Sequence, residues 1–311
     1  MIETTLYKHL ISQTELAEYL TTYNGRPAVF SQSAPSDEDK RWRNGPKYNR
    51  IVFAEDTQGD PERIMGGTLV VDIMCAETDG NKYFPEDIEP IVRKLIDGWF
   101  FSKGTFTVAA QWKTTSYFTE PTDKVTGCTV AFELLAFPVS NYAPNVVAQF
   151  NEWTTKFQGI HVINRDMLPE AAWKPRDGES AIYWRIATER QSNWIASTYH
   201  TLWKTASVKG YIFSATPAEA SEVAYRITTQ LYADKRLKTR TGELLRVGES
   251  PIMVNTNNTV DNGADPLRTG QLTIEATYGV IAHDVTENSL KNINTLQKGE
   301  SQWRTVRKQL Q

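Results

Sequence analysis

The sequence predicts an α+β fold made of two tandem, similar domains, each a mostly antiparallel β-sheet with helices packed on one face. Residues 46–138 and 180–281 share one order of elements: two extended strands, an amphipathic helix, a short strand and a long closing strand. The repeat spans about a hundred residues, which is the size of a domain rather than of a solenoid repeat. Apolar and polar residues alternate along the strands, as in sheets with one covered face.

Each copy contains a helix that begins with proline and follows an apolar strand. The helix is predicted over Pro85–Trp99 in the first copy and over Pro217–Leu231 in the second. Proline suits the first turn of a helix, because the backbone N–H groups of that turn have no partner within the helix. The first helix also has acidic residues in its first turn and Arg93 and Lys94 near its end, an order that the helix dipole favours.

The other elements of the first copy follow from periodicity and turn residues. Apolar residues at three- and four-residue steps predict a helix over residues 2–23, which Asn24 and Gly25 end. A polar loop is expected over residues 33–48, and a polar segment over residues 113–124. Strands are expected over residues 27–31, 50–55, 67–75, 105–111 and 126–137.

The second copy repeats this plan. A leading helix is expected over residues 145–156, and strands over residues 160–163, 207–213 and 270–278. We therefore predict a first domain over residues 1–140, a second, similar domain over residues 141–283, and a helical or flexible C-terminal tail over residues 284–311. A chain of 311 residues is long enough for each domain to bury its own core.

Composition and charge narrow the class of protein. With 40% hydrophobic and 23% charged residues, the chain has an ordinary soluble composition, and its net charge of −3 gives no bulk attraction to nucleic acid. Residues 1–140 hold 14 basic and 20 acidic residues, whereas residues 141–311 hold 20 and 17. Halves of opposite charge can orient neighbouring copies, although random surface variation gives the same numbers. No apolar run is long enough for a membrane span, and Met1–Ile11 lacks the pattern of a signal peptide.

No catalytic or cofactor motif accompanies the repeat. The sequence has no phosphate-binding loop, no nucleophile elbow and no pair of histidines at metal-ligand spacing. Cys75 and Cys128 fall on predicted strands and are expected to be buried thiols of a reducing compartment, with a disulfide between neighbouring strands as the less favoured alternative. We therefore expect neither an enzyme nor a metal or cofactor.

Three exposed segments and the tail are the candidate contacts. The charged loop offers Asp37, Arg41, Trp42 and Arg43, and the polar segment offers Lys113, Tyr117, Phe118 and Lys124; the second copy offers the basic residues Arg236, Lys238 and Arg240, and the tail offers Trp303. Trp42 and Trp303 are the tryptophans that a core explains least well. The loop is either solvated or in contact with a partner. The basic stretch is an exposed hairpin, a contact to an acidic neighbouring subunit or, least favoured, a DNA contact.

The first half resembles a phage tail terminator, also called a tail completion protein. The likeness is closest in Gly67–Ile73 followed by Pro85–Ile88 and Ile91–Gly98, and it covers roughly residues 1–140. The second half matches the same outline more loosely, through Pro217–Leu231 and residues 270–279. A typical member of the family is a single domain, so the doubling departs from the pattern.

The resemblance implies a homo-oligomeric ring, commonly a hexamer, at the head-proximal end of the tail in the virion. Such a ring caps the tail tube and faces the head–tail connector or stopper protein, with sheath protein as a further partner if the tail is contractile. It would be assembled in the host cytoplasm, without a membrane, and DNA would only pass through its lumen. Two domains per chain fit either a ring of six with two layers or a ring of three with quasi-equivalent domains.

Other functions stay open at this point. Another neck or baseplate component of the tail can be built from the same fold. A hydrolase that uses scattered carboxylates, or a small-ligand binding module, belongs to a different class, and a deep apolar pocket with convergent carboxylates would favour the enzyme.

Overall fold

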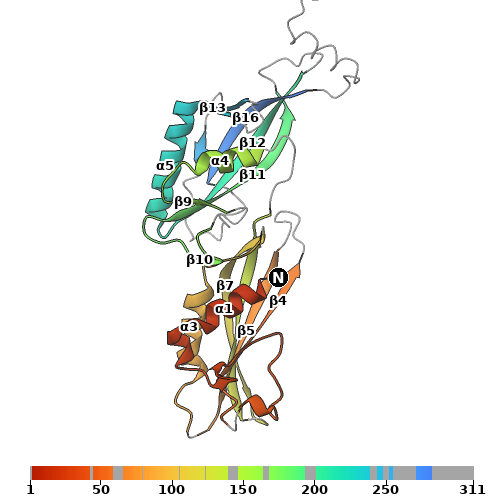
Figure 1. The fold of residues 1–311 in the computed structure, drawn as a ribbon, viewed down its shortest axis with the longest axis vertical. Helices are drawn as coiled ribbons and strands as arrows, with labels where there is room; N and C mark the ends of the chain where they lie inside the picture. The colour runs from red at the N-terminus through yellow and green to blue at the C-terminus, as the bar shows by residue number, and fades with distance from the viewer. Residues whose placement is uncertain are drawn as a thin grey trace, which may run out of the picture.

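Two seven-stranded sheets, one above the other along the long axis, form the framework of the part of the chain that the structure describes (Figure 1). This computed structural model describes residues 2–42, 45–58, 66–78, 80–104, 106–122, 124–138, 146–163, 168–192, 201–238, 244–247, 252–254 and 271–281. The predicted fold class, two similar α+β domains in tandem, is confirmed.

The first domain contains three helices, a short 3₁₀ turn and most of the first sheet, among the described residues. Its elements are α1 (Glu3–Ile11), α2 (Thr14–Ala17), β1 (Thr22–Tyr23), β2 (Arg26–Pro27), β3 (Val29–Ser31), η1 (Lys40–Trp42), β4 (Arg50–Gln58), β5 (Gly66–Ala76), α3 (Pro85–Ile96), β6 (Phe100–Lys103), β7 (Phe106–Glu120) and β8 (Val125–Ala136). The strands β1 and β2 form a separate small ribbon.

The second domain follows the same plan, with short strands after α5. Its elements are α4 (Val146–Thr154), β9 (Ile160–Val162), β10 (Ala172–Trp173), β11 (Ser180–Gln191), β12 (Thr201–Phe213), α5 (Pro217–Asp234), β13 (Arg236–Lys238), β14 (Leu244–Val247), β15 (Met253–Val254) and β16 (Leu272–Ile281).

The two sheets have the same strand order. The first runs β10-β6-β7-β8-β5-β4-β3, and the second runs β13-β14-β16-β12-β11-β9 with β15 beside β16. In each sheet the short strand after the leading helix is parallel to its neighbour, while the other ladders are antiparallel. A fold with one topology in both halves is the expected product of a duplication, and it lets each element of one domain be matched to an element of the other.

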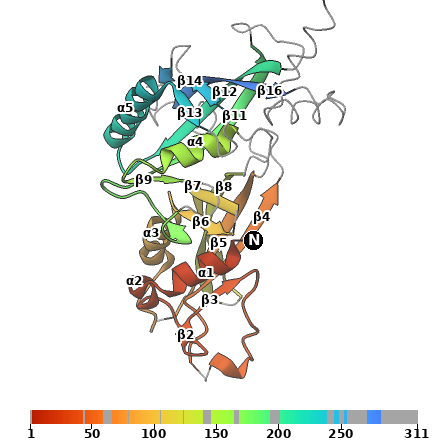
Figure 2. The ribbon, with the colours of Figure 1, turned by 45° about the horizontal axis from the view of Figure 1, so that its top comes forward.

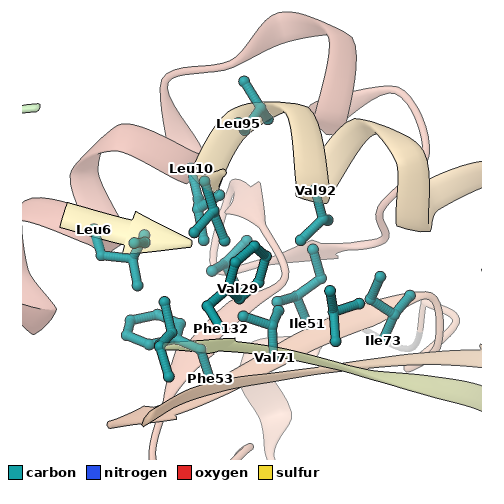
Figure 3. Packing of buried hydrophobic residues seen from close by; sticks show 14 of the residues in the cluster. Leu6, Leu10, Val29, Ile51, Phe53, Val71, Ile73, Val92, Leu95 and Phe132 are labelled. Carbon is teal, nitrogen blue, oxygen red and sulfur yellow. The ribbon is translucent and has the colours of Figure 1, made fainter. Parts of the chain in front are cut away.

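One face of each sheet packs on helices and forms the core. In the first domain, Leu6 and Leu10 of α1 and Val92 of α3 meet Phe53 and Val71 of the sheet (Figure 3). In the second, α4 and α5 cover the corresponding face (Figure 2). The Thr216 hydroxyl accepts a hydrogen bond from the Glu219 N–H, while the Glu219 carboxylate accepts one from the Thr216 N–H. This capping box fixes where α5 begins.

The domains meet through the opposite, helix-free faces of their sheets. Phe100 and Phe137 of the first domain pack on Phe213 of the second at ring-centroid distances of 5.2 and 5.6 Å. The Tyr183 hydroxyl donates a hydrogen bond of 2.9 Å to the carbonyl oxygen of Pro138. Because aromatic rings bury a large apolar area, this cluster holds the two sheets in one relative orientation.

Several predicted elements were wrong in extent. The single helix over residues 2–23 is two helices and a strand, because the extended backbone of Gln13 separates α1 from α2. The helix that begins at Pro85 ends at Ile96, and the predicted continuation to Trp99 missed β6. The polar segment over residues 113–124 is largely the second half of β7. Its residues are exposed on both faces, so they show no alternation of apolar and polar side chains.

One strand crosses the predicted domain boundary. β10 lies in the predicted second domain, but it pairs with β6 and so extends the first sheet. The boundary between residues 140 and 141 therefore does not separate the two sheets completely.

Gly127 of β8 has no room for a side chain. A Cβ atom there would overlap the ring of Phe118 and lie 2.6 Å from the carbonyl oxygen of Ile73. We expect Gly127→Ala to reduce the free energy of unfolding by about 2 kcal/mol, the usual cost of overpacking a core. The matched Gly80→Ala, where nothing lies within 4 Å, should change it by less than about 0.5 kcal/mol. Urea denaturation measures both; equal effects would show that the overlap is relieved by movement.

Burial lowers the pKa of His9, which packs between Trp99 and Phe101 and donates from Nε2 to the carbonyl oxygen of Leu95 at 2.9 Å. Because the folded pKa lies below the ordinary value of 6.5, the neutral ring stabilises the fold at higher pH. This stability is lost as the pH falls from 6.5 through the folded pKa. Urea denaturation at pH 7.5 and 5 should show a larger loss for the wild type than for His9→Gln. Equal losses would contradict this expectation.

Candidate interaction surface

The second half of β7 is an open edge of the first sheet. Residues 106–109 pair with β6 on one side, and residues 108–120 pair with β8 on the other, with a register shift between Trp112 and Thr114. Among the described residues, no strand pairs with residues 113–120 on the side away from β8. An unpaired edge presents backbone N–H and C=O groups to any extended chain that approaches, so it is a template for pairing with another molecule.

Helix α3 supports this edge from one face. The Arg93 guanidinium lies over the ring of Trp112 at 5.0 Å, and it is 3.7 Å from the carboxylate of Glu89. That carboxylate accepts a hydrogen bond of 2.9 Å from the Thr115 hydroxyl, which in turn accepts one from Nε1 of Trp112. The contacts fix the edge strand relative to the helix, so the strand is ordered before any partner binds.

Two aromatic side chains flank the edge on the side of α3. Trp112 is 37% exposed and Tyr117 is 55% exposed. Large aromatic residues that are exposed beside an open edge are typical of binding hot spots. The strand between and after them is rich in threonine and serine, with Lys113 and Glu120 as the charged residues of positions 113–120. Lys113 is itself in an ion pair of 2.5 Å with Glu133.

The second sheet also has an open edge, but charged residues protect it. β9 pairs with Ser180–Ile182, and among the described residues no strand covers the rest of β11 on that side. Glu189 accepts hydrogen bonds from Lys204 and Tyr278, and Arg190 forms an ion pair of 2.8 Å with Glu275. Charges at an edge oppose strand addition, because a pairing strand would have to displace their water. The edge of β7 therefore permits the addition of a strand, whereas the edge of β11 opposes it.

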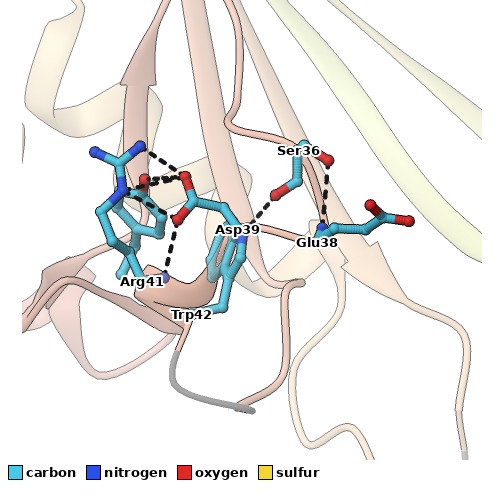
Figure 4. Close-up of polar contacts among 6 residues, drawn as sticks. Ser36, Glu38, Asp39, Arg41 and Trp42 are labelled. Carbon is cyan, nitrogen blue, oxygen red and sulfur yellow. Dashed lines mark hydrogen bonds and ion pairs between the residues drawn. The ribbon is translucent and has the colours of Figure 1, made fainter.

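The predicted charged loop is held by its own contacts. Asp37 forms an ion pair of 3.0 Å with Arg50. Arg41 binds Asp39 at 2.6 Å (Figure 4), and its guanidinium lowers the pKa of that carboxyl. Arg41 also lies over the ring of Tyr23, 5.2 Å from its centroid. Asp37 and Arg41 stay partly exposed and can still contact a partner.

Trp42 was wrongly predicted as an interface residue. Its side chain is 3% exposed, it packs on Tyr23 at 4.7 Å and Phe30 at 5.8 Å, and its Nε1 donates to the carbonyl oxygen of Ser36 (Figure 4). The loop folds around this tryptophan and forms a small core of its own, which a charged local sequence does not reveal. Arg43 lies outside the described residues.

The remaining predicted residues divide among several places. Tyr117 belongs to the open edge, whereas the ring of Phe118 covers Gly127 of the neighbouring strand. Lys124 lies exposed in the turn that joins β7 to β8, with a positive φ of 52°. In the second domain, the predicted basic hairpin is present, because Arg236 and Lys238 of β13 pair with β14. The Lys238 side chain, Arg240 and Trp303 lie outside what the structure describes.

A cavity of about 530 Å³ lies between the domains. Phe100, Leu135 and Phe213 contribute much of its apolar wall, and Asp97 is the carboxylate among its lining residues. Oδ1 of Asp97 already accepts a hydrogen bond of 2.8 Å from the Trp112 N–H. Asp97 has no second carboxylate beside it in the described lining, so this lining does not hold the carboxylate pair that the hydrolase alternative would use.

Sequence reasoning placed Lys113 and Tyr117 in a candidate contact segment, but it missed that this segment is the open edge of a strand, and it missed the cavity. Within the described ranges, no group of three or more His, Cys, Asp or Glu side chains could hold a metal ion. Burial raises the pKa of Cys75 and of Cys128 to about 12, so neither buried thiol is a nucleophile at neutral pH. Every helix in these ranges is too short or too polar to span a lipid bilayer.

Comparison of the chain with models of protein families found no match, and comparison with curated proteins found none either. Function is therefore inferred from the geometry of the surface.

Trp42 provides a test of structural against interface roles. We expect Trp42→Ala to reduce the free energy of unfolding by about 3 kcal/mol, as is usual when a buried tryptophan is truncated. The matched Tyr117→Ala, at an exposed aromatic residue, should cost about 0.5 kcal/mol. Chemical denaturation of the two variants measures the difference. A small loss for Trp42→Ala would restore this residue as a candidate contact.

Proposed function

We propose that this chain is a structural protein that assembles with copies of itself into a ring, and that the ring ends a phage tail on its head-proximal side. The observation that carries the assembly is the open, almost uncharged edge over residues 113–120 of β7. The family resemblance of residues 1–140 supports the place of the ring in a phage tail.

Sheet pairing explains how such a ring would form and what it would do. An edge strand gains backbone hydrogen bonds and buries Trp112 and Tyr117 when a neighbouring strand is added. A closed ring covers the edges of its own subunits and presents fixed faces above and below. One face would cap the tail tube protein, and the other would meet the connector or stopper protein. The work is mechanical, so no nucleophile or cofactor takes part in it.

The alternative within the same class is another neck or baseplate component. It uses the same edge and the same ring, and it differs in which proteins the two faces bind. Binding of the purified chain to its tail tube protein, rather than to baseplate proteins, would favour the terminator. A sheath contact would follow only if the tail is contractile.

Assembly can be tested with one substitution on each edge. Wild-type chain should form discrete rings in mass photometry and negative-stain images at micromolar concentration. Tyr117→Lys puts a charge into the open edge and should weaken assembly about tenfold or more, which corresponds to about 1.4 kcal/mol. The matched control, Thr188→Lys on the protected edge of β11, should assemble like the wild type. Circular dichroism should show that both variants fold.

Two outcomes would overturn the proposal. If the wild-type chain stays monomeric at micromolar concentration, the β7 edge does not mediate assembly. If Tyr117→Lys and Thr188→Lys weaken assembly equally, the added charge acts without regard to position and the β7 edge is not the interface.

A further inference from the structure

A second surface feature, a pocket of about 460 Å³, lies between α4, the C-terminal end of α5 and β13. The lining residues come from these three elements and from the segment just after α4: Gln149, Glu152, Trp153, Lys156, Asp234, Arg236 and Leu237. The pocket is in the second domain, away from the β7 edge, and the proposed assembly through that edge does not use it.

The pocket holds polar groups that the described residues leave without partners. The side-chain carbonyl oxygen of Gln149 is buried and accepts no hydrogen bond. Asp234 is satisfied, since its carboxylate accepts hydrogen bonds of 2.7 Å from Nε1 of Trp153 and from the Gln230 amide. Lys156 and Arg236 form no ion pair with described residues, and neither does Glu152, whose carboxylate also lines the pocket. A buried acceptor without a donor costs stability, so its presence beside two free cations needs a reason.

The first domain shows what fills the corresponding place. Because the strand orders match, the junction of α1, the end of α3 and β6 is the counterpart of this pocket. There His9 donates a hydrogen bond to the carbonyl oxygen of Leu95. The ring of Trp99 packs on the ring of His9 at a centroid distance of 4.2 Å. Three residues, 97–99, connect α3 to β6, whereas Lys235 alone connects α5 to β13. The second domain therefore has no counterpart of Trp99.

Helix α2 is the other part that the second domain lacks. In the first domain it follows α1, buries Leu16 completely, and places the Glu15 carboxylate 3.2 Å from Nζ of Lys94 at the end of α3. In the second domain, residues 155–159 join α4 directly to β9. The first domain thus covers this junction with an acidic helical segment of its own, while the second leaves it open with Lys156 and Arg236 unpaired.

We propose that this pocket receives an acidic peptide segment of a neighbouring subunit, an inference that rests on the proposed assembly. The carboxylate of the segment pairs with Arg236 and Lys156, as Glu15 pairs with Lys94. The Gln149 side chain, whose oxygen is buried, turns toward the segment and accepts a hydrogen bond from one of its N–H groups. Charge complementarity favours a second copy as the source. Residues 1–140 hold 20 acidic and 14 basic residues, whereas residues 141–311 hold 17 and 20.

The first experiment measures assembly of the full chain by mass photometry. The double variant Lys156→Glu, Arg236→Glu should dissociate at a concentration about a hundredfold higher than the wild type, because two attractions become repulsions. The control Lys82→Glu, Lys103→Glu carries the same charge change on exposed residues of the first domain and should assemble normally. Equal assembly of both double variants and the wild type overturns the pocket inference, but leaves the edge proposal standing.

A peptide probe separates the pocket from the ring. A fluorescent peptide with the sequence of residues 12–20, which contains Glu15 and Glu18, should bind the full chain in anisotropy titrations. It should lose at least tenfold in affinity for the Lys156→Glu, Arg236→Glu variant. The same peptide with both glutamates replaced by glutamine should bind the wild-type chain as weakly as the unmodified peptide binds the double variant. Equal binding of the two peptides, or no binding at all, overturns the inference even if the wild type forms rings.

Substitution of Gln149 distinguishes a role in binding the segment from a purely structural role. Gln149→Leu removes the buried acceptor, so the melting temperature should stay the same or rise, while peptide affinity and assembly fall. If Gln149 only supports the fold, the melting temperature should drop and peptide affinity should not change. That result would also overturn the inference.

Discussion

The contact between the helix-free faces of the two sheets determines how everything else in this chain is placed. A sheet with helices on one face must cover or solvate the other. Here the covering is aromatic: Phe100 and Phe137 pack on Phe213, and Tyr183 ties its hydroxyl to Pro138. The added strand β10 joins the sheet of the first domain. These contacts join the two domains and set where the open edge of β7 lies relative to the pocket of the second domain.

The duplicated halves keep one topology but differ in the side chains that meet a partner. Equivalent backbone hydrogen bonds, from Gln32 to Phe53 and from Ile163 to Ile182, align the two sheets. By this alignment Tyr183, Tyr211 and Phe213 of the second domain correspond to Ala54, Val70 and Asp72 of the first. At these positions the first domain therefore lacks the aromatic residues with which the second domain docks. The proposed assembly therefore uses another surface, the open edge of β7.

The sequence was informative where local chemistry decides structure. Pro85 and Pro217 marked the starts of two helices correctly, because proline and acidic residues favour a first helical turn. The sequence was uninformative where a contact between residues far apart in the chain decides the structure. Residues 113–120 form a strand although no apolar stripe marks it, and Trp42 is buried although its neighbours are charged. The pocket around Gln149 arises from segments that the second domain lacks, which a single reading of the sequence does not show.

The geometry of the edge also restricts the symmetry of the proposed assembly. If β7 pairs with β7 of a second copy, each edge is used up and assembly ends at a two-fold dimer. A ring needs β7 to pair with a different edge. The first sheet offers one at its opposite side, where β4 continues beyond its ladder with β3, which ends at Phe53. This stretch carries Glu55 and Asp56, so a strand that pairs there must leave both carboxylates solvated or paired. Pairing of β7 with this edge is heterologous, and it closes into a ring when the rotation between neighbours divides a full turn. A measured mass of two chains therefore argues for the first arrangement, and a mass of three or six chains for the second.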